Sequence, residues 1–125
     1  YMMAAKARMF GDNDTLQAIL ACNDPREQQA LGRRVRNFKQ DVWDKEARNV
    51  VFAGNLAKFS QNPKLAAVLL ATNKTILAEA SPYDCVWGIG LDETDPRARD
   101  PEQWRGKNWL GETLMRVRDH LQGQE

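Results

Sequence analysis

Hydrophobic residues recur at helical spacing along most of the chain. The spacing predicts helices over residues 1–10, 14–22, 25–31, 41–60, 63–71 and 108–121. Asp24-Pro25 and Asn62-Pro63 each place a capping side chain before a proline at the first helical position. The longest helix, 41–60, carries two offset apolar stripes, so we expect it to be central.

The pattern changes after residue 71. Residues 72–75 read as a turn, and residues 76–80 and 86–90 are too short and too extended in character for helices, so they predict two strands that could pair. Ser81-Pro82-Tyr83-Asp84 is the turn between them, and residues 92–106 form a long, charged surface loop. The pattern therefore predicts a mostly helical chain with a small, short-stranded β component.

Composition narrows the class of protein. The 125 residues are one domain's worth of chain, so we expect a single domain over 1–125. Eighteen Lys and Arg against 17 Asp and Glu leave a net charge of +1, which argues against a generally basic nucleic-acid binder. No apolar run approaches the roughly 20 residues that span a bilayer, and the first residues lack a signal peptide's pattern. We expect a cytoplasmic protein without a membrane partner, and the start at Tyr1 inside a helix suggests that upstream sequence is missing.

The chain is poor in metal ligands. Cys22, Cys85 and His120 are too few and too far apart in sequence for a structural zinc site, so we expect no metal and no cofactor. A Cys85–His120 nucleophile pair is an alternative, although His120 is more simply a solvated cation at a helix end.

Lys6 is the most unusual position in the first predicted helix. At 100° per residue it falls between Met2, Met9 and Phe10, in the middle of the apolar face. Its ammonium could reach water past a packed alkyl stem. Alternatively, burial lowers its pKa, and the amine could form a Schiff base or, when charged, anchor a phosphate or carboxylate.

Two carboxylates flank the predicted turn. Glu79 and Asp84 could divide acid and base roles, as glycosidic-bond hydrolysis requires. The alternatives are a solvent-facing strand residue for Glu79 and a turn-capping side chain for Asp84. Trp87 is either a stacking surface for a heterocycle or a core residue. Gly88 and Gly90 would allow close approach of a ligand but do not make a dinucleotide-binding fingerprint.

Two further places could bind an anion. Asn108 and Gly111 lie at the start of the last helix, where free amides favour phosphate, and the alternative for Asn108 is an ordinary N-cap. Arg33, with Arg34 and Arg36, could hold a phosphate or form a solvated edge.

An ordered series of motifs resembles the NADAR family, which includes the YbiA-like proteins. The series is Tyr1-Met2-Met3-Ala4-Ala5-Lys6-Ala7, Leu31-Gly32-Arg33, Lys58-Phe59, Glu79-Ala80-Ser81, Asp84, Trp87-Gly88-Ile89-Gly90, Trp104-Arg105-Gly106-Lys107-Asn108, Leu110-Gly111, Leu114-Met115 and Arg118.

The resemblance implies an α+β domain that hydrolyses N-glycosidic bonds between a ribose and a base-like group. The implied substrates are ribosylaminopyrimidine phosphates of riboflavin biosynthesis, or ADP-ribosylated guanine in nucleic acid. The alternative is a non-catalytic module that binds ADP-ribose or a nucleotide. The oligomeric state is left open.

The resemblance also assigns site residues. Lys6, Glu79 and Asp84 would be catalytic, and Trp87, Asn108 and Gly111 would bind substrate. We expect Gly88, Gly90 and Arg33 to bind substrate as well, for the reasons given above for those residues. Members of the family also carry a Glu-His pair upstream of the lysine helix, before the first residue of this sequence.

Overall fold

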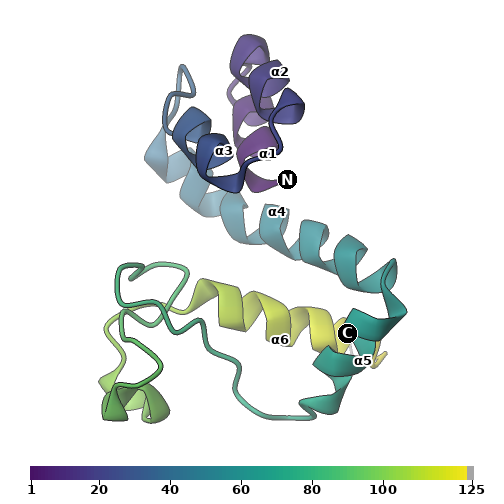
Figure 1. The fold of residues 1–125 in the computed structure, drawn as a ribbon, viewed down its shortest axis with the longest axis vertical. Helices are drawn as coiled ribbons and strands as arrows, with labels where there is room; N and C mark the ends of the chain where they lie inside the picture. The colour runs from purple at the N-terminus through teal and green to yellow at the C-terminus, as the bar shows by residue number, and fades with distance from the viewer. Residues whose placement is uncertain (124–125) are drawn as a thin grey trace. The chain divides into compact units, whose positions relative to one another are not determined.

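The computed structural model describes residues 1–123, and these residues are mainly helical (Figure 1). The α-helices are α1 (Met2–Met9), α2 (Asn13–Ala21), α3 (Pro25–Gly32), α4 (Gln40–Ser60), α5 (Pro63–Ala71) and α6 (Trp109–Leu121). Two short 3-10 helices, η1 (Pro96–Arg99) and η2 (Pro101–Gln103), interrupt the long loop before α6. The helices predicted from hydrophobic spacing are confirmed to within about two residues at each end.

Side-chain capping explains where α3 begins, whereas the cap predicted for α5 is wrong. At α3 the Asp24 carboxylate accepts a hydrogen bond from the Arg26 amide at 2.9 Å, and Pro25 occupies the first turn, as predicted. At α5 the Asn62 side chain makes no such cap. Its Nδ2 instead donates to the Lys58 carbonyl at 2.6 Å, so this side chain closes the end of α4.

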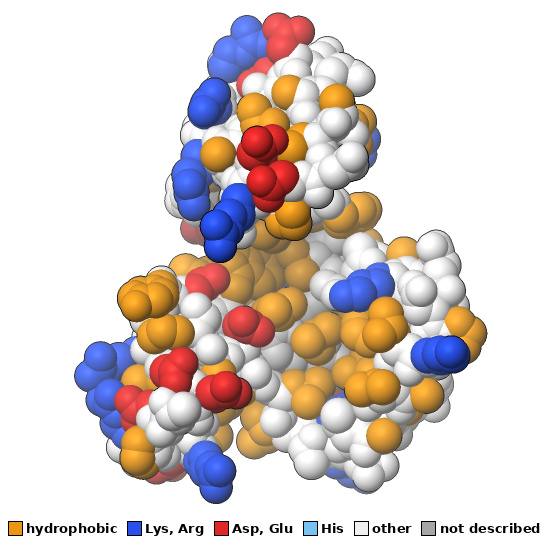
Figure 2. Space-filling model, viewed as in Figure 1, with side chains coloured by type: hydrophobic (Ala, Val, Ile, Leu, Met, Phe, Trp, Pro, Cys, Tyr) orange, Lys and Arg blue, Asp and Glu red, His pale blue; other side chains and the backbone are white. Residues whose placement is uncertain are grey.

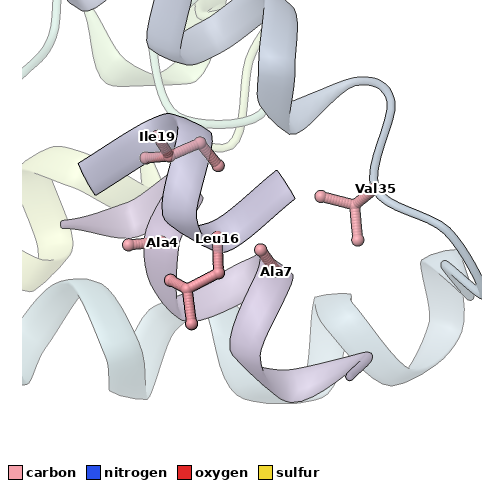
Figure 3. Close-up of a cluster of buried hydrophobic side chains, with 5 residues drawn as sticks. All are labelled: Ala4, Ala7, Leu16, Ile19 and Val35. Atoms are coloured by element: carbon pink, nitrogen blue, oxygen red, sulfur yellow. The ribbon is translucent and has the colours of Figure 1, made fainter. Parts of the chain in front are cut away.

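The chain divides into two compact units, residues 1–50 and the residues from Val51 onward, with the boundary inside α4. In the first, α1, α2 and the segment after α3 enclose a hydrophobic core, shown in Figure 3. Its buried members are Ala4, Ala7, Leu16, Ile19 and Val35.

The buried face of α1 differs from the predicted one. Ala4 and Ala7 are buried, whereas Met9, expected on the apolar face beside Lys6, is 36% exposed. On α2, Leu16 and Ile19 are buried, whereas Leu20 is 57% exposed. The small alanines allow α1 and α2 to approach closely, and this contact decides which side is buried.

The first unit also contains a buried carboxylate that the hydrophobic pattern did not reveal. The Asp12 side chain is fully buried and accepts hydrogen bonds from Thr15 in α2 and from the backbone and guanidinium of Arg36. These bonds hold the pKa of Asp12 well below its usual range, chiefly through the Arg36 guanidinium. Asp12 therefore ties the segment after α3 to the N-terminus of α2.

The predicted β component is wrong, because no strand is present in residues 1–123. Residues 76–80 and 86–90 are extended or bent without forming a ladder, and the bond from the Ile89 amide to the Glu79 carbonyl is a single link between them. Instead, the amides of residues 105–110 donate to carbonyls of residues 85–89 at 2.8–3.1 Å. The polar backbone groups of the expected strand are thus satisfied by a segment about 20 residues later in the chain. The fold is helical with irregular connections, not α+β.

Within residues 1–123 no helix is both long enough and apolar enough to cross a membrane.

Candidate functional site

A cavity of about 230 Å³ lies in the second unit. Its lining comes from the end of α4, from α5 and the turn after it, from residues 77–79, and from the first two turns of α6. The lining residues are Phe59, Val68, Leu69, Thr72, Leu77, Ala78, Glu79, Leu110, Gly111 and Leu114. Glu79 is the one ionisable residue in this mostly apolar lining.

The cavity is beside an exposed hydrophobic surface on α5. Val68, which lines the cavity, is 68% exposed, and Leu65 on the same helix is 41% exposed. Figure 2 shows hydrophobic side chains gathered over α5.

The backbone of Glu79 is held from two sides. The Asn108 side chain accepts a hydrogen bond from the Glu79 amide at 3.0 Å, and the Glu79 carbonyl accepts one from the Ile89 amide at 2.9 Å. Glu79 is exposed and is one of the residues that line the cavity. The sequence alternative of a solvent-facing residue is therefore accurate for its exposure, although the residue does not lie on a strand.

Asp84 has the geometry of the turn-capping alternative. Its carboxylate oxygen Oδ1 accepts hydrogen bonds from the amides of Val86 and Trp87 at 3.0 and 2.8 Å. The side chain is half-buried and does not line the cavity of Glu79. Its catalytic role remains a prediction.

Trp87 packs against Trp109. The two rings meet edge to face, with centroids 5.5 Å apart and planes at 87°, and the Lys107 ammonium lies 5.3 Å from the centre of the Trp109 ring. Trp87 is half-buried, and part of its ring surface is covered by this contact.

The glycines allow two irregular segments to approach closely. A Cβ at Gly106 would lie 2.1 Å from the Gly88 carbonyl oxygen, and a Cβ at Gly88 would lie 2.9 Å from the Asp84 oxygen. Gly90 has a φ of +72°, which other residues rarely adopt. Gly88 and Gly90 are thus explained by packing, and their contact with a substrate stays a prediction.

The start of α6 differs from the expected anion site. The amides of Asn108, Trp109 and Leu110 donate to the carbonyls of Gly88, Val86 and Trp87, so they are not free. Gly111 lies in the cavity wall, where a Cβ would come within 2.1 Å of the Leu77 oxygen.

Lys6 and Arg33 lie in the first unit. Lys6 is half-buried on α1, and its ammonium is 4.3 Å from the centre of the Phe38 ring, which in turn packs edge to face on Phe10 at 5.2 Å. Burial lowers the pKa of Lys6, and the nearby Arg33 charge lowers it further. The Phe38 ring acts in the opposite direction because it attracts the cation.

The basic residues after α3 do not act as one cluster. Arg33 and Arg34 are exposed, whereas Arg36 is paired with Asp12 and, at 3.3 Å, with Asp14. Figure 2 shows Lys and Arg side chains along one edge of this unit.

The structure therefore brings only some of the predicted site residues together. Glu79 and Gly111 line one cavity, and Asn108 contacts the backbone of its wall. Asp84, Trp87, Gly88 and Gly90 lie in the adjoining loop of the same unit, while Lys6 and Arg33 belong to the other unit.

Arg118 is a residue whose position the sequence pattern did not explain. It is only 4% exposed, and its guanidinium donates to the Thr72 hydroxyl and the Thr75 carbonyl, each at 2.9 Å. It fixes the turn that leads into the cavity wall. The one feature of the sequence that singled out Arg118 was its place in the NADAR-like series of motifs.

No group of three or more His, Cys, Asp or Glu side chains in the described part of the chain could hold a metal ion.

Comparison with known proteins assigns the family. The NADAR domain model matches residues 1–122, so the chain belongs to the NADAR domain family, as the sequence motifs predicted. A protein of Acanthamoeba polyphaga mimivirus that is named an N-glycosidase is 45% identical over 122 residues, which cover 98% of this chain and 72% of the relative. The predicted enzyme class, a hydrolase of N-glycosyl bonds, agrees with that name.

Two other relatives are longer than this chain. Protein irg-1 of Caenorhabditis elegans is 42% identical over 123 residues, covering 97% of this chain and 58% of the relative. The chloroplastic riboflavin biosynthesis protein PYRR of Zea mays is 32% identical over 114 residues, covering 88% of this chain and 16% of the relative. The chain thus spans little more than half of the nematode protein and a small part of the maize protein.

Proposed function

We propose that this chain hydrolyses the N-glycosidic bond between a ribose and a base-like leaving group. The observation that carries the proposal is the 45% identity, over 98% of the chain, to a protein named an N-glycosidase. The cavity supports it, because an apolar lining suits a flat base and Glu79 supplies a carboxylate at its edge.

The finer proposal concerns the sugar. We propose a phosphoribosyl group on an aminopyrimidine, or the ADP-ribosyl group of modified guanine in nucleic acid. The relative named for riboflavin biosynthesis supports the first of these substrates.

In the direct route, the bond from the ribosyl C1 to nitrogen breaks through an oxocarbenium-like state, and water adds to C1. Glu79 accepts a proton from the attacking water. The leaving nitrogen takes up a proton from solvent water. In the covalent route, the neutral Lys6 amine attacks C1 and expels the base, which takes up the proton that the amine loses. The resulting glycosylamine opens its ring by breaking the C1–O4′ bond, and water hydrolyses the Schiff base to the free sugar and Lys6. The lowered pKa of Lys6 increases the share of neutral amine at a given pH.

The test uses both substrate classes. The chain is incubated with a ribosylaminopyrimidine phosphate and, separately, with DNA carrying ADP-ribosylated guanine, and release of the free sugar is measured. Release from either substrate supports hydrolysis. Binding of ADP-ribose without release from either substrate would overturn the enzyme proposal in favour of a binding module.

Borohydride trapping separates the two routes. The covalent route predicts a substrate-dependent adduct that is lost in Lys6→Met and retained in the control Lys39→Met, an exposed lysine of the same unit. Turnover without a trapped adduct would leave the direct route.

A further inference from the structure

Asn108 makes two hydrogen bonds to one short piece of the cavity wall. Its Nδ2 donates to the Leu77 carbonyl at 2.9 Å, and its Oδ1 accepts from the Glu79 amide at 3.0 Å. The residue is only 3% exposed. The carboxamide therefore satisfies two backbone groups of residues 77–79 in the way that a neighbouring strand would.

The backbone of Asn108 is itself constrained. Its φ is +55°, in the left-handed region that asparagine tolerates better than most residues. Its amide donates to the Gly88 carbonyl, and its carbonyl accepts from the Glu112 amide, both at 3.0 Å. The side chain thus extends from an anchored point between the loop and α6.

Gly111 leaves the space that this side chain occupies. A Cβ at Gly111 would lie 2.4 and 2.6 Å from the carboxamide nitrogen and oxygen of Asn108. A larger residue would push the carboxamide away from Leu77 and Glu79.

We propose that Asn108 is a positioning residue for Glu79, acting through the backbone, and that it does not bind the substrate. The inference rests on the proposed function for the role of Glu79. Both polar atoms of the carboxamide are already engaged with the chain, and the residue that they hold is the one ionisable residue of the cavity lining. Loss of the carboxamide would release the segment and misplace the carboxylate.

Hydrogen exchange tests the placement without requiring activity. Asn108→Gly removes the carboxamide but tolerates the positive φ, and Asn73→Gly is a matched control because Asn73 also has a φ of +55° and is exposed. We expect the Glu79 amide to exchange at least about 10-fold faster in Asn108→Gly and unchanged in Asn73→Gly. Equal protection of the Glu79 amide in both variants would overturn the proposal.

Kinetics tests the consequence for catalysis. Misplacement should lower kcat on the order of 10- to 100-fold in Asn108→Gly, with little change in KM. In a Glu79→Gln background the same substitution should have almost no further effect, because the group being positioned is gone. An equal loss in both backgrounds, or a rise in KM alone, would instead indicate that Asn108 binds substrate.

Asn108→Asp serves if the glycine variant does not fold. It keeps an acceptor for the Glu79 amide but loses the donor to the Leu77 carbonyl. Loss of that donor should lower kcat with little change in KM, and an unchanged kcat would overturn the proposal. If the unsubstituted chain hydrolyses neither substrate, the proposed function fails, while the exchange comparison still decides whether Asn108 holds Glu79.

Discussion

At the scale of single residues, the three predicted catalytic residues differ in the contacts that hold them in place. Glu79 is placed by hydrogen bonds to its backbone and is exposed in the lining of a cavity. The Asp84 carboxylate is bonded to two amides of its own turn. Lys6 is half-buried between an aromatic ring and a second positive charge. Of these three, Glu79 is the residue that lines the cavity.

Lys6 should react as an amine at lower pH than an ordinary lysine. Burial and the Arg33 charge both lower its pKa, so its neutral form appears earlier as the pH rises. Reductive methylation followed by mass spectrometry across a pH series should show a lower midpoint for Lys6 than for the exposed Lys39.

Arg33→Gln should then raise the Lys6 midpoint toward the ordinary value, because one nearby positive charge is removed. Arg34→Gln is the control, because it also removes an exposed positive charge but leaves Arg33, the charge that lowers the pKa of Lys6. Identical midpoints for Lys6 and Lys39 in the unsubstituted chain would contradict the described environment of Lys6.

At the scale of elements, side chains and irregular segments replace regular pairing. Asp12 joins the N-terminus of α2 to the segment after α3, and Arg118 joins α6 to the turn after α5. The amides that precede and open α6 bond to residues 85–89. Contacts of this kind connect parts of the chain that are distant in sequence, so a local sequence pattern does not predict them.

Asp12→Asn should destabilise the first unit. The Asp12 carboxylate has a pKa lowered in the folded state, so its contribution is complete above the unfolded value near 3.8 and is lost as the pH falls through the folded value. At pH 7 the variant should show a lower Tm, and the difference from the unsubstituted chain should shrink at strongly acidic pH.

Asp14→Asn is the matched control for Asp12. Asp14 contacts the same Arg36 guanidinium, but its side chain is 94% exposed, so its loss should change Tm little. Equal changes in Tm for the two variants would mean that burial of Asp12 is not what makes its bonds matter.

Gly111→Ala should destabilise the chain although alanine favours helices. The added Cβ would meet the Leu77 oxygen at 2.1 Å and the Asn108 carboxamide. We expect a loss of about 1–3 kcal/mol in the free energy of unfolding, measured by urea denaturation. Glu112→Ala, at the next and exposed position, should be nearly neutral, and a Gly111→Ala variant of unchanged stability would contradict the close contact.

At the scale of the whole molecule, the sequence predicted the helices and not their connections. Spacing, the Asp24 cap and the prolines act within a few residues, so α1 to α6 were located from the pattern alone. The two expected strands failed because their partners are residues 105–110 and the Asn108 side chain, which a short window cannot reveal. The motifs singled out Glu79, Asn108 and Gly111, but the cavity that relates them needed three-dimensional packing.

The near-neutral net charge of the whole chain bears on how it could recognise nucleic acid. A net charge of +1 gives no general attraction to nucleic acid, so recognition of a modified base would depend on the site itself. The role proposed for Glu79 is accordingly local, because Glu79 is the one ionisable residue in the lining of the cavity.

The most direct test is kcat for sugar release by the unsubstituted chain, by Glu79→Gln and by Glu102→Gln. Glu102 is an exposed glutamate on η2 and serves as the matched control. We predict a loss on the order of 100-fold or more for Glu79→Gln, as expected for a general base, and an unchanged kcat for Glu102→Gln. A Glu79→Gln variant that releases the sugar as fast as the unsubstituted chain would contradict the account.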